Sequence, residues 1–163
     1  MINLLAYKKD MTVSEKSINR FLMFRLPLAF IAGVRLRSLD EERSLVTVKF
    51  RWMNQNPFKS MYFAVQSMAA ELTTGALLMK HISESGHSIS MLVTNYNASF
   101  HKKAVGRIRF DCEDGSKISG AIENAIQSVE GQVIKLRSKG INEDGIVVSE
   151  YRFEWSIKLK NNN

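Results

Sequence analysis

The segment NPFKSMYFAVQSMAAELTTGALL, residues 56–78, carries two charged side chains, Lys59 near its start and Glu71 among methyl groups in its middle. Its apolar residues lie nearly all round the helical axis, which predicts a buried helix rather than a surface helix. Ser67, Glu71 and Thr74 are spaced i, i+4 and i+7, so they share one stripe of that helix. Burial of a carboxylate with few partners raises its pKa toward the range useful for a general base. Glu71 is therefore the first candidate for a catalytic residue.

Structural explanations exist for the same residues. A buried acid is usually paired, so Glu71 could be bonded to a serine or threonine of a partner subunit or to an arginine such as Arg107. Asn56 precedes a proline, and Asn-Pro commonly begins a turn. Tyr62 belongs to a residue type that more often packs than reacts, although its hydroxyl can donate a hydrogen bond. Both readings stay open on the sequence.

The other titratable residues show no pattern for a metal site. His81, His87 and His101 are scattered without metal-ligand spacing, and one cysteine cannot form a zinc site. That cysteine, Cys112, falls on the apolar face of an expected strand, where a thiol packs and stays inert. We expect no metal cofactor.

The order of elements explains how the central helix is enclosed. Period-two alternation predicts strands, and capping or stop signals predict helix ends. The expected elements are a helix over 13–24 capped by Thr12 and closed by Pro27, a strand hairpin over 34–38 and 46–52, the central helix over 60–81, strands over 89–100 and 106–112, an outer helix over 117–130, and a hairpin over 132–139 and 147–159. An antiparallel sheet with one long apolar helix between its second and third strands must curve around that helix to cover it. We predict an α+β fold in a single domain over 1–163, with 1–30 as an N-terminal helical segment and 160–163 as a frayed tail.

Composition limits the compartment and the partners. Hydrophobic residues make up 45% and charged residues 24% of the 163 residues, which is ordinary for a soluble globular protein. The longest apolar run, residues 26–34, is too short to span a bilayer, and no signal peptide is recognisable, so we expect a cytoplasmic protein without a membrane partner. The single cysteine fits a reducing compartment. A net charge of +7 favours an anionic partner, but no dense basic tract or aromatic-interleaved motif points to nucleic acid.

The first hairpin, followed by NPFKSMYFAVQSMAAELTTG and a strand leading into NYNASFHKKAVG, resembles the hotdog-fold thioesterases. The similarity covers about residues 31–160. It is closest to the branch of uncharacterised domains related to the phenylacetate-pathway and 4-hydroxybenzoyl-CoA enzymes, in which an extra helix such as that over 117–130 is typical. The resemblance implies a curved sheet wrapped around the central helix. It also implies subunits that pair edge to edge into a homodimer, which can pair further into a tetramer, with acyl-CoA sites at the dimer interface.

Active members of that family carry an asparagine or glutamine, then His-Gly-Gly at the helix start, then an acid nine positions after the histidine. Laid on this sequence without gaps, the pattern puts the amide on Asn56, the His-Gly-Gly on Tyr62, Phe63 and Ala64, and the acid on Glu71. The amide and the acid match in kind and spacing, whereas the His-Gly-Gly does not. The resemblance implies Glu71 as general base or nucleophile, Asn56 as the group that orients water or the carbonyl, and the N–H of Phe63 as oxyanion donor.

The resemblance also implies a function and a set of substrate contacts. The expected substrate-binding residues are Tyr62, Ala64, Ser67, Thr74, Ser88, Ser90, Lys102 and Lys103. The two lysines belong to a cationic stretch that could hold CoA phosphates, and a plain solvated strand end explains them equally well. The implied activity is hydrolysis of an acyl-CoA or acyl-carrier thioester, with no cofactor beyond the coenzyme A of the substrate. The altered His-Gly-Gly leaves a non-catalytic acyl- or CoA-binding or interaction domain as the alternative.

Overall fold

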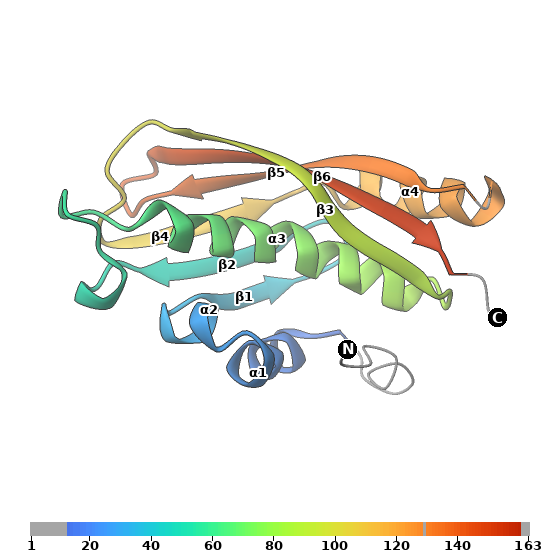
Figure 1. The fold of residues 1–163 in the computed structure, drawn as a ribbon, viewed down its shortest axis with the longest axis horizontal. Coiled ribbons are helices and arrows are strands. Elements are labelled where there is room, and N and C mark those ends of the chain that lie inside the picture. Colours follow the sequence, from blue (N-terminus) through green and yellow to red (C-terminus); the bar gives the residue numbers. More distant parts are fainter. Residues whose placement is uncertain (1–12, 129, 161–163) are drawn as a thin grey trace.

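A six-stranded antiparallel sheet curves around one long helix in the computed structural model, which describes residues 13–128 and 130–160 (Figure 1). The helix is α3 (Phe63–Glu84), which follows the second strand as the sequence predicts. In sheet order the strands are β1 (Arg35–Leu39), β2 (Ser44–Lys49), β4 (Arg107–Cys112), β5 (Gln132–Ile141), β6 (Val147–Leu159) and β3 (Ile89–Phe100). The predicted hotdog arrangement is confirmed.

The concave face of the sheet and α3 share the hydrophobic core. Strand β6 contributes alternate residues to it, from Tyr151 to Ile157, all buried. Small side chains on α3 let the sheet approach closely, and a Cβ added at Gly75 would lie 3.3 Å from the Trp155 ring. Burial of each large aliphatic side chain stabilises this contact by roughly 1.5–3 kcal/mol. The core therefore fixes the rotation of α3 and the face on which Glu71 lies.

The N-terminal helices differ from the prediction. Helix α1 (Glu15–Arg25) is capped by Ser14, whose hydroxyl accepts from the N–H of Ser17 at 3.3 Å. The predicted cap, Thr12, lies outside the described residues. Pro27 closes α1 but also begins a second short helix, α2 (Pro27–Ile31), because proline is well suited to the first position of a helix. The sequence analysis did not predict this second helix between Pro27 and the first strand.

The predicted strand over 46–52 is too long. Strand β2 ends at Lys49, and Trp52–Asn54 form a short 3-10 helix, η2. The buried Asn54 side chain causes the departure from the sheet, since its amide donates to the carbonyls of Lys49 and Ala32 at 2.9 and 3.0 Å. Trp52 is consequently 81% exposed instead of lying on the buried face.

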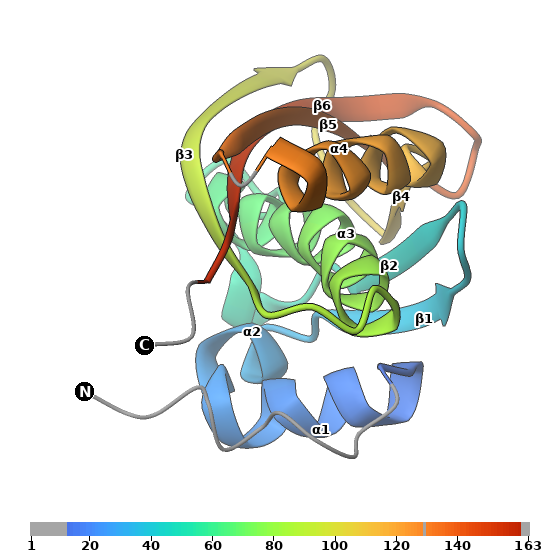
Figure 2. The ribbon, with the colours of Figure 1, turned by 90° about the vertical axis from the view of Figure 1, so that its right-hand side faces the viewer.

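The outer helix is confirmed as α4 (Gly115–Ser128), which packs against α3 and β5 through Ile118, Ile122 and Ala125 (Figure 2). Its first residue must be glycine, because a Cβ at Gly115 would collide with the backbone of Glu41 and Glu42. Among the described residues no helix is long and apolar enough to cross a membrane.

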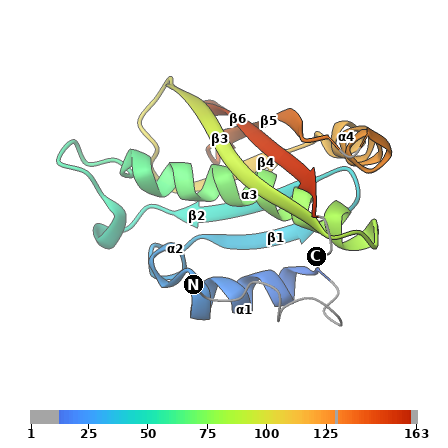
Figure 3. The same ribbon diagram turned by 45° about the vertical axis from the view of Figure 1, so that its right-hand side comes forward.

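The two edges of the sheet are treated differently. Helix α1 runs along β1 (Figure 3), and the Asn19 side chain accepts from the N–H of Leu36 at 3.0 Å and donates to its carbonyl at 2.8 Å. Glu15 accepts from the N–H of Leu39 at 3.1 Å. These side chains occupy backbone groups that another strand would need. No described element covers the other edge, β3, beyond its pairing with β6.

Replacing Asn19 with alanine is expected to lower the free energy of unfolding by about 1–3 kcal/mol, because two backbone groups of Leu36 lose their partner. Urea unfolding measures the change. Lys16→Ala, an exposed position on the same helix, is the matched control and should change stability by less than about 0.5 kcal/mol. Equal losses in the two variants would show that the Asn19 side chain does not hold this edge.

Candidate active site

Glu71 lies in the middle of α3, half-buried, beside the indole of Trp155. A Cβ at Gly75 would lie 3.5 Å from Oε1 of Glu71 and 3.3 Å from Cη2 of Trp155, so the missing side chain leaves room for both groups. The indole N–H donates to Oγ1 of Thr74 at 3.1 Å, and Thr74 donates to the carbonyl of Glu71 at 3.0 Å. Glycine, indole and threonine together fix the wall against which the carboxylate lies.

The carboxylate of Glu71 has no hydrogen bond or ion pair to any of the residues in 13–128 and 130–160. Burial raises its pKa above the ordinary value, with no charged group to oppose the shift. Ser67, on the same stripe, donates to the carbonyl of Phe63 at 3.0 Å, so its proton is used on the backbone. Pairing of Glu71 with Arg107 is not observed, although such a pairing was a plausible structural explanation for a buried acid. An unpaired carboxylate with a raised pKa is suited to accept and return a proton.

Tyr151, on β6, is a buried polar residue near this face of α3 that the sequence analysis did not single out. Its hydroxyl lies near those of Ser67 and Ser149 without completing a hydrogen bond to either, and burial raises its pKa to about 12. Ser149 instead donates to the Gln66 side chain at 3.0 Å. The signal in the sequence is a tyrosine where the alternating apolar face of the last strand needs only a phenylalanine.

The start of α3 presents two free N–H groups. Among the described residues neither Phe63 nor Ala64 has an acceptor for its backbone N–H, as expected for the first turn of a helix. The rings of Tyr62 and Phe63 pack edge to face at 4.8 Å, and Phe63 also contacts Phe100 at 6.4 Å between ring centroids. A tyrosine thus stands at the histidine position of the family pattern and a phenylalanine at its first glycine, while the backbone donors remain.

Phe63 and Glu71 do not meet within one chain. Both belong to α3, and eight residues at about 1.5 Å each separate their backbones by about 12 Å along the axis. A thioester carbonyl must lie within hydrogen-bond distance of its oxyanion donor and close to the attacking group. Residues from two different chains are not held to this separation, so a pair of chains could bring them to one carbonyl.

Asn56 shapes a turn. Its Oδ1 accepts from the N–H of Phe58 at 2.9 Å and from that of Ser60 at 3.2 Å, and its Nδ2 donates to the Ser60 hydroxyl at 3.1 Å. These bonds match the turn interpretation of Asn-Pro. The structure does not bring the Asn56 amide into hydrogen-bond contact with Glu71.

The remaining predicted contacts divide between the two ends of α3. Lys103 donates to the carbonyl of Phe58 at 3.0 Å, and the carbonyl of Ala104 accepts from the N–H of Met61, so Lys102 and Lys103 belong to the end where α3 begins. Ser88 and Ser90 follow the other end, and the Ser90 hydroxyl donates to the carbonyl of Lys158 at 3.1 Å. Within one chain these serines do not join the lysines in one site.

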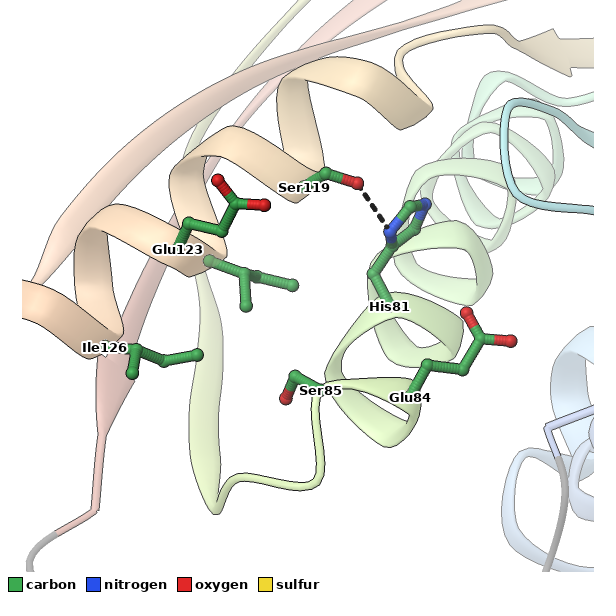
Figure 4. Close-up of a pocket in the computed structure, with 7 residues that line it drawn as sticks. His81, Glu84, Ser85, Ser119, Glu123 and Ile126 are labelled. Carbon is green, nitrogen blue, oxygen red and sulfur yellow. Dashed lines mark hydrogen bonds between the residues drawn. The ribbon is translucent and has the colours of Figure 1, made fainter.

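A surface hollow of about 280 Å³ lies between the last turns of α3 and the facing side of α4 (Figure 4). It is lined by His81, Glu84, Ser85, Ser119, Ile122, Glu123 and Ile126. His81 donates from Nε2 to the carbonyl of Glu41 at 2.7 Å, since a carbonyl can only accept, and its Nδ1 lies 3.2 Å from the Ser119 hydroxyl. In the part of the chain that the structure describes, no three histidine, cysteine or acidic side chains are placed to hold a metal. The hollow does not include Glu71, so it is not the candidate active site.

Comparison with solved structures agrees with the fold. A Chlorobaculum tepidum protein of unknown function is 17% identical with a TM-score of 0.78, covering 93% of this chain and 100% of that one. A Pseudomonas aeruginosa protein described as of unknown function and a probable thioesterase is 21% identical with a TM-score of 0.77, covering 89% and 96%. A Haemophilus influenzae thioesterase is 12% identical with a TM-score of 0.67, covering 96% and 98%. These identities are low, so the likeness establishes the fold.

No curated protein matches the chain. The model of one protein family, described as a domain of unknown function and designated DUF4442, matches residues 14–157. Because that match spans most of the sequence, the chain belongs to the DUF4442 family.

Proposed function

We propose that the protein hydrolyses acyl thioesters of coenzyme A or of a carrier protein, with Glu71 as the catalytic carboxylate. The observation that carries the proposal is an unpaired, half-buried carboxylate with a raised pKa on the central helix of a hotdog fold. Solved structures of similar fold that are named thioesterases support it. The same proposal places the protein functionally nearest the branch related to the phenylacetate-pathway and 4-hydroxybenzoyl-CoA thioesterases.

The chemistry needs one group that both takes and returns a proton. As a general base, Glu71 removes a proton from water while the water oxygen bonds to the thioester carbon. Collapse of the tetrahedral intermediate breaks the carbon–sulfur bond, and the departing thiolate takes up a proton, giving a carboxylic acid and a free thiol. As a nucleophile, Glu71 attacks the thioester carbon and expels the thiolate, which takes up a proton to give the free thiol. Water then hydrolyses the resulting mixed anhydride, which releases the carboxylic acid and restores the Glu71 carboxylate. Either route requires a donor for the carbonyl oxygen, and the free N–H of Phe63 is suited to that role.

The proposed active form is a homodimer paired through β3. This strand is twelve residues long, and it carries the exposed apolar side chains of Leu92, Tyr96 and Phe100. A long edge strand with exposed apolar residues is a template for pairing with another strand. The opposite edge is occupied by Asn19 and Glu15 of α1, which favours pairing through β3. A dimer also lets Glu71 of one chain and Phe63 of the other serve one substrate.

A panel of acyl-CoA thioesters of different chain length, with aliphatic and aromatic acyl groups, tests the activity by release of free thiol. Turnover of at least one member is the expected result. The Tyr62–Phe63 ring pair at the helix start favours the alternative of a non-catalytic acyl-CoA-binding domain. That alternative predicts no turnover together with a rise in melting temperature on adding acyl-CoA. Absence of both turnover and stabilisation across the panel would contradict any thioester-directed function.

A further inference from the structure

The N-terminal helices and the 3-10 helix η2 carry an exposed apolar surface. We define this N-terminal apolar surface by Phe24, Leu26, Leu28, Ile31, Trp52 and Met53, all of which are exposed. Leu28 is 77% and Trp52 81% exposed, and every residue from 23 to 28 is exposed. The amide of Asn54 donates to the carbonyl of Ala32, which holds the end of η2 against the end of α2. The two apolar groups are therefore neighbours.

The two chain segments that carry this surface contain basic residues and no acid. Residues 16–39 contain Lys16, Arg20, Arg25, Arg35 and Arg37, and residues 44–70 contain Lys49, Arg51 and Lys59, while neither segment has an aspartate or glutamate. None of these cations forms an ion pair with a described residue, and the ion pairs of the described chain lie outside both segments. Burial lowers the pKa of Arg35, and the neighbouring Arg37 and Arg51 lower it further. The segments that carry the apolar side chains are therefore basic, and the nearest acids along the chain include Glu15, Asp40 and Glu71.

The cations and apolar residues of α1 lie on its outer face. Lys16, Arg20 and Phe24 are spaced at four residues, so they share a stripe, while Ile18 and Leu22 face the sheet and are buried. The stripe ends at Phe24, beside the exposed turn that leads into α2. Helix α1 therefore presents cations along its length and apolar tips at its end, on the side away from the core.

We propose that the N-terminal apolar surface docks the protein on a lipid bilayer that contains anionic lipids. Protruding aromatic and aliphatic tips enter the boundary between headgroups and acyl chains, and the surrounding arginines and lysines contact lipid phosphates. The sequence expectation of no membrane partner rested on the lack of a spanning segment, which a surface-bound protein does not need. The surface does not include β3, the edge strand proposed for pairing, which lies at the opposite end of the strand order from β1.

Charge complementarity favours lipid over a second copy of the chain. A two-fold contact of this surface with itself would set cations opposite cations, because neither segment offers an acid. An anionic bilayer supplies the opposite charge and an apolar layer together. A protein partner with an acidic, apolar face is the other possible occupant, and the experiment separates it from lipid.

The chain has two tryptophans, one buried in the core and one on the N-terminal apolar surface, so tryptophan fluorescence tests binding directly. Trp155 is buried in the core and Trp52 belongs to the surface, so binding should shift and protect the fluorescence of Trp52 alone. The full-length protein is mixed with vesicles of phosphatidylcholine and, separately, with vesicles that also contain phosphatidylglycerol, and binding is followed by flotation and by a blue shift in emission. We expect binding to the anionic vesicles that weakens with added salt. Failure of the folded protein to bind the anionic vesicles would overturn the proposal.

Three variants separate the apolar contribution to vesicle binding from the cationic one. Phe24→Ser combined with Leu28→Ser should weaken partitioning about tenfold or more through lost apolar insertion. Arg20→Gln and Arg25→Gln should each weaken it about fivefold. Val133→Ser, an exposed apolar position on β5, is the matched control and should leave partitioning unchanged. An equal loss of vesicle binding in the Val133→Ser control would overturn the assignment. The assignment would also fail if the wild type did not bind vesicles while the Phe24→Ser, Leu28→Ser double variant changed its oligomer mass, because the surface would then be a contact between copies of the chain.

Discussion

Replacing Glu71 with glutamine is expected to lower kcat for thioester hydrolysis by about a thousandfold or more, while the Kd for acyl-CoA changes little. Glutamine preserves the shape of the side chain beside Trp155 but can neither accept a proton nor form an anhydride. Free-thiol release at saturating substrate gives kcat, and calorimetry gives Kd. Glu84→Gln, a carboxylate in the last turn of the same helix, should retain wild-type turnover. A Glu71→Gln protein with wild-type kcat would show that this carboxylate is not the catalytic group.

The same substitution should stabilise the fold at neutral pH. Burial raises the pKa of Glu71 in the folded chain, so the folded state holds this proton more tightly than the unfolded state does. Ionisation therefore destabilises the wild type as pH rises from the ordinary carboxylate pKa through the raised one. Below about pH 4 both states are protonated and the wild type loses nothing from this group. Urea unfolding of both proteins across this range should show a difference that grows with pH, and a pH-independent difference would contradict the assignment.

The fold could be read from the sequence where burial imposes a period. Strand β6 alternates Tyr151, Phe153, Trp155 and Ile157 toward the core, and α3 is apolar nearly all round because the sheet encloses it. The predicted end of the second strand was wrong because a single polar side chain determines the course of the backbone there. Asn54 draws the chain out of the sheet after Lys49, and this needs the carbonyls of Lys49 and Ala32, which lie far apart in the sequence. The alternation of apolar and polar residues continues through Trp52, so it does not indicate that the strand ends at Lys49.

The candidate site was predictable only in part, and for a related reason. Glu71 stands out because a charge among methyl groups is unfavourable unless it has a use or a partner. The amide of Asn56 has the right type and spacing for the family pattern, yet its bonding capacity is spent on the N–H groups of Phe58 and Ser60. Spacing along the chain also hides distance along a helix. Residues eight apart look close in a motif, whereas in α3 their backbones lie on different turns.

Phe63→Pro tests the oxyanion donor without disturbing the helix. Phe63 is the first residue of α3, where proline is well tolerated, and Tyr62 already has the extended backbone that a following proline requires, with φ −61° and ψ 135°. Its N–H has no acceptor among the described residues, so its removal costs the fold no hydrogen bond there. We expect kcat to fall about 100- to 1,000-fold. Phe63→Ala keeps the N–H and is the matched control, so an equal loss of kcat in both variants would assign the effect to the ring.

Mixing the two inactive variants decides whether one site uses two chains. About 12 Å of helix separates the Phe63 N–H from Glu71 in one chain, so a productive site in the proposed dimer combines Glu71 of one subunit with the N–H of the other. In a heterodimer of Glu71→Gln and Phe63→Pro, one of the two sites then receives both intact groups. Free exchange makes half of the dimers mixed, so activity should return to about a quarter of the wild-type value. If each site were complete within one chain, every site would carry one defect, and the mixture would remain as inactive as its parents.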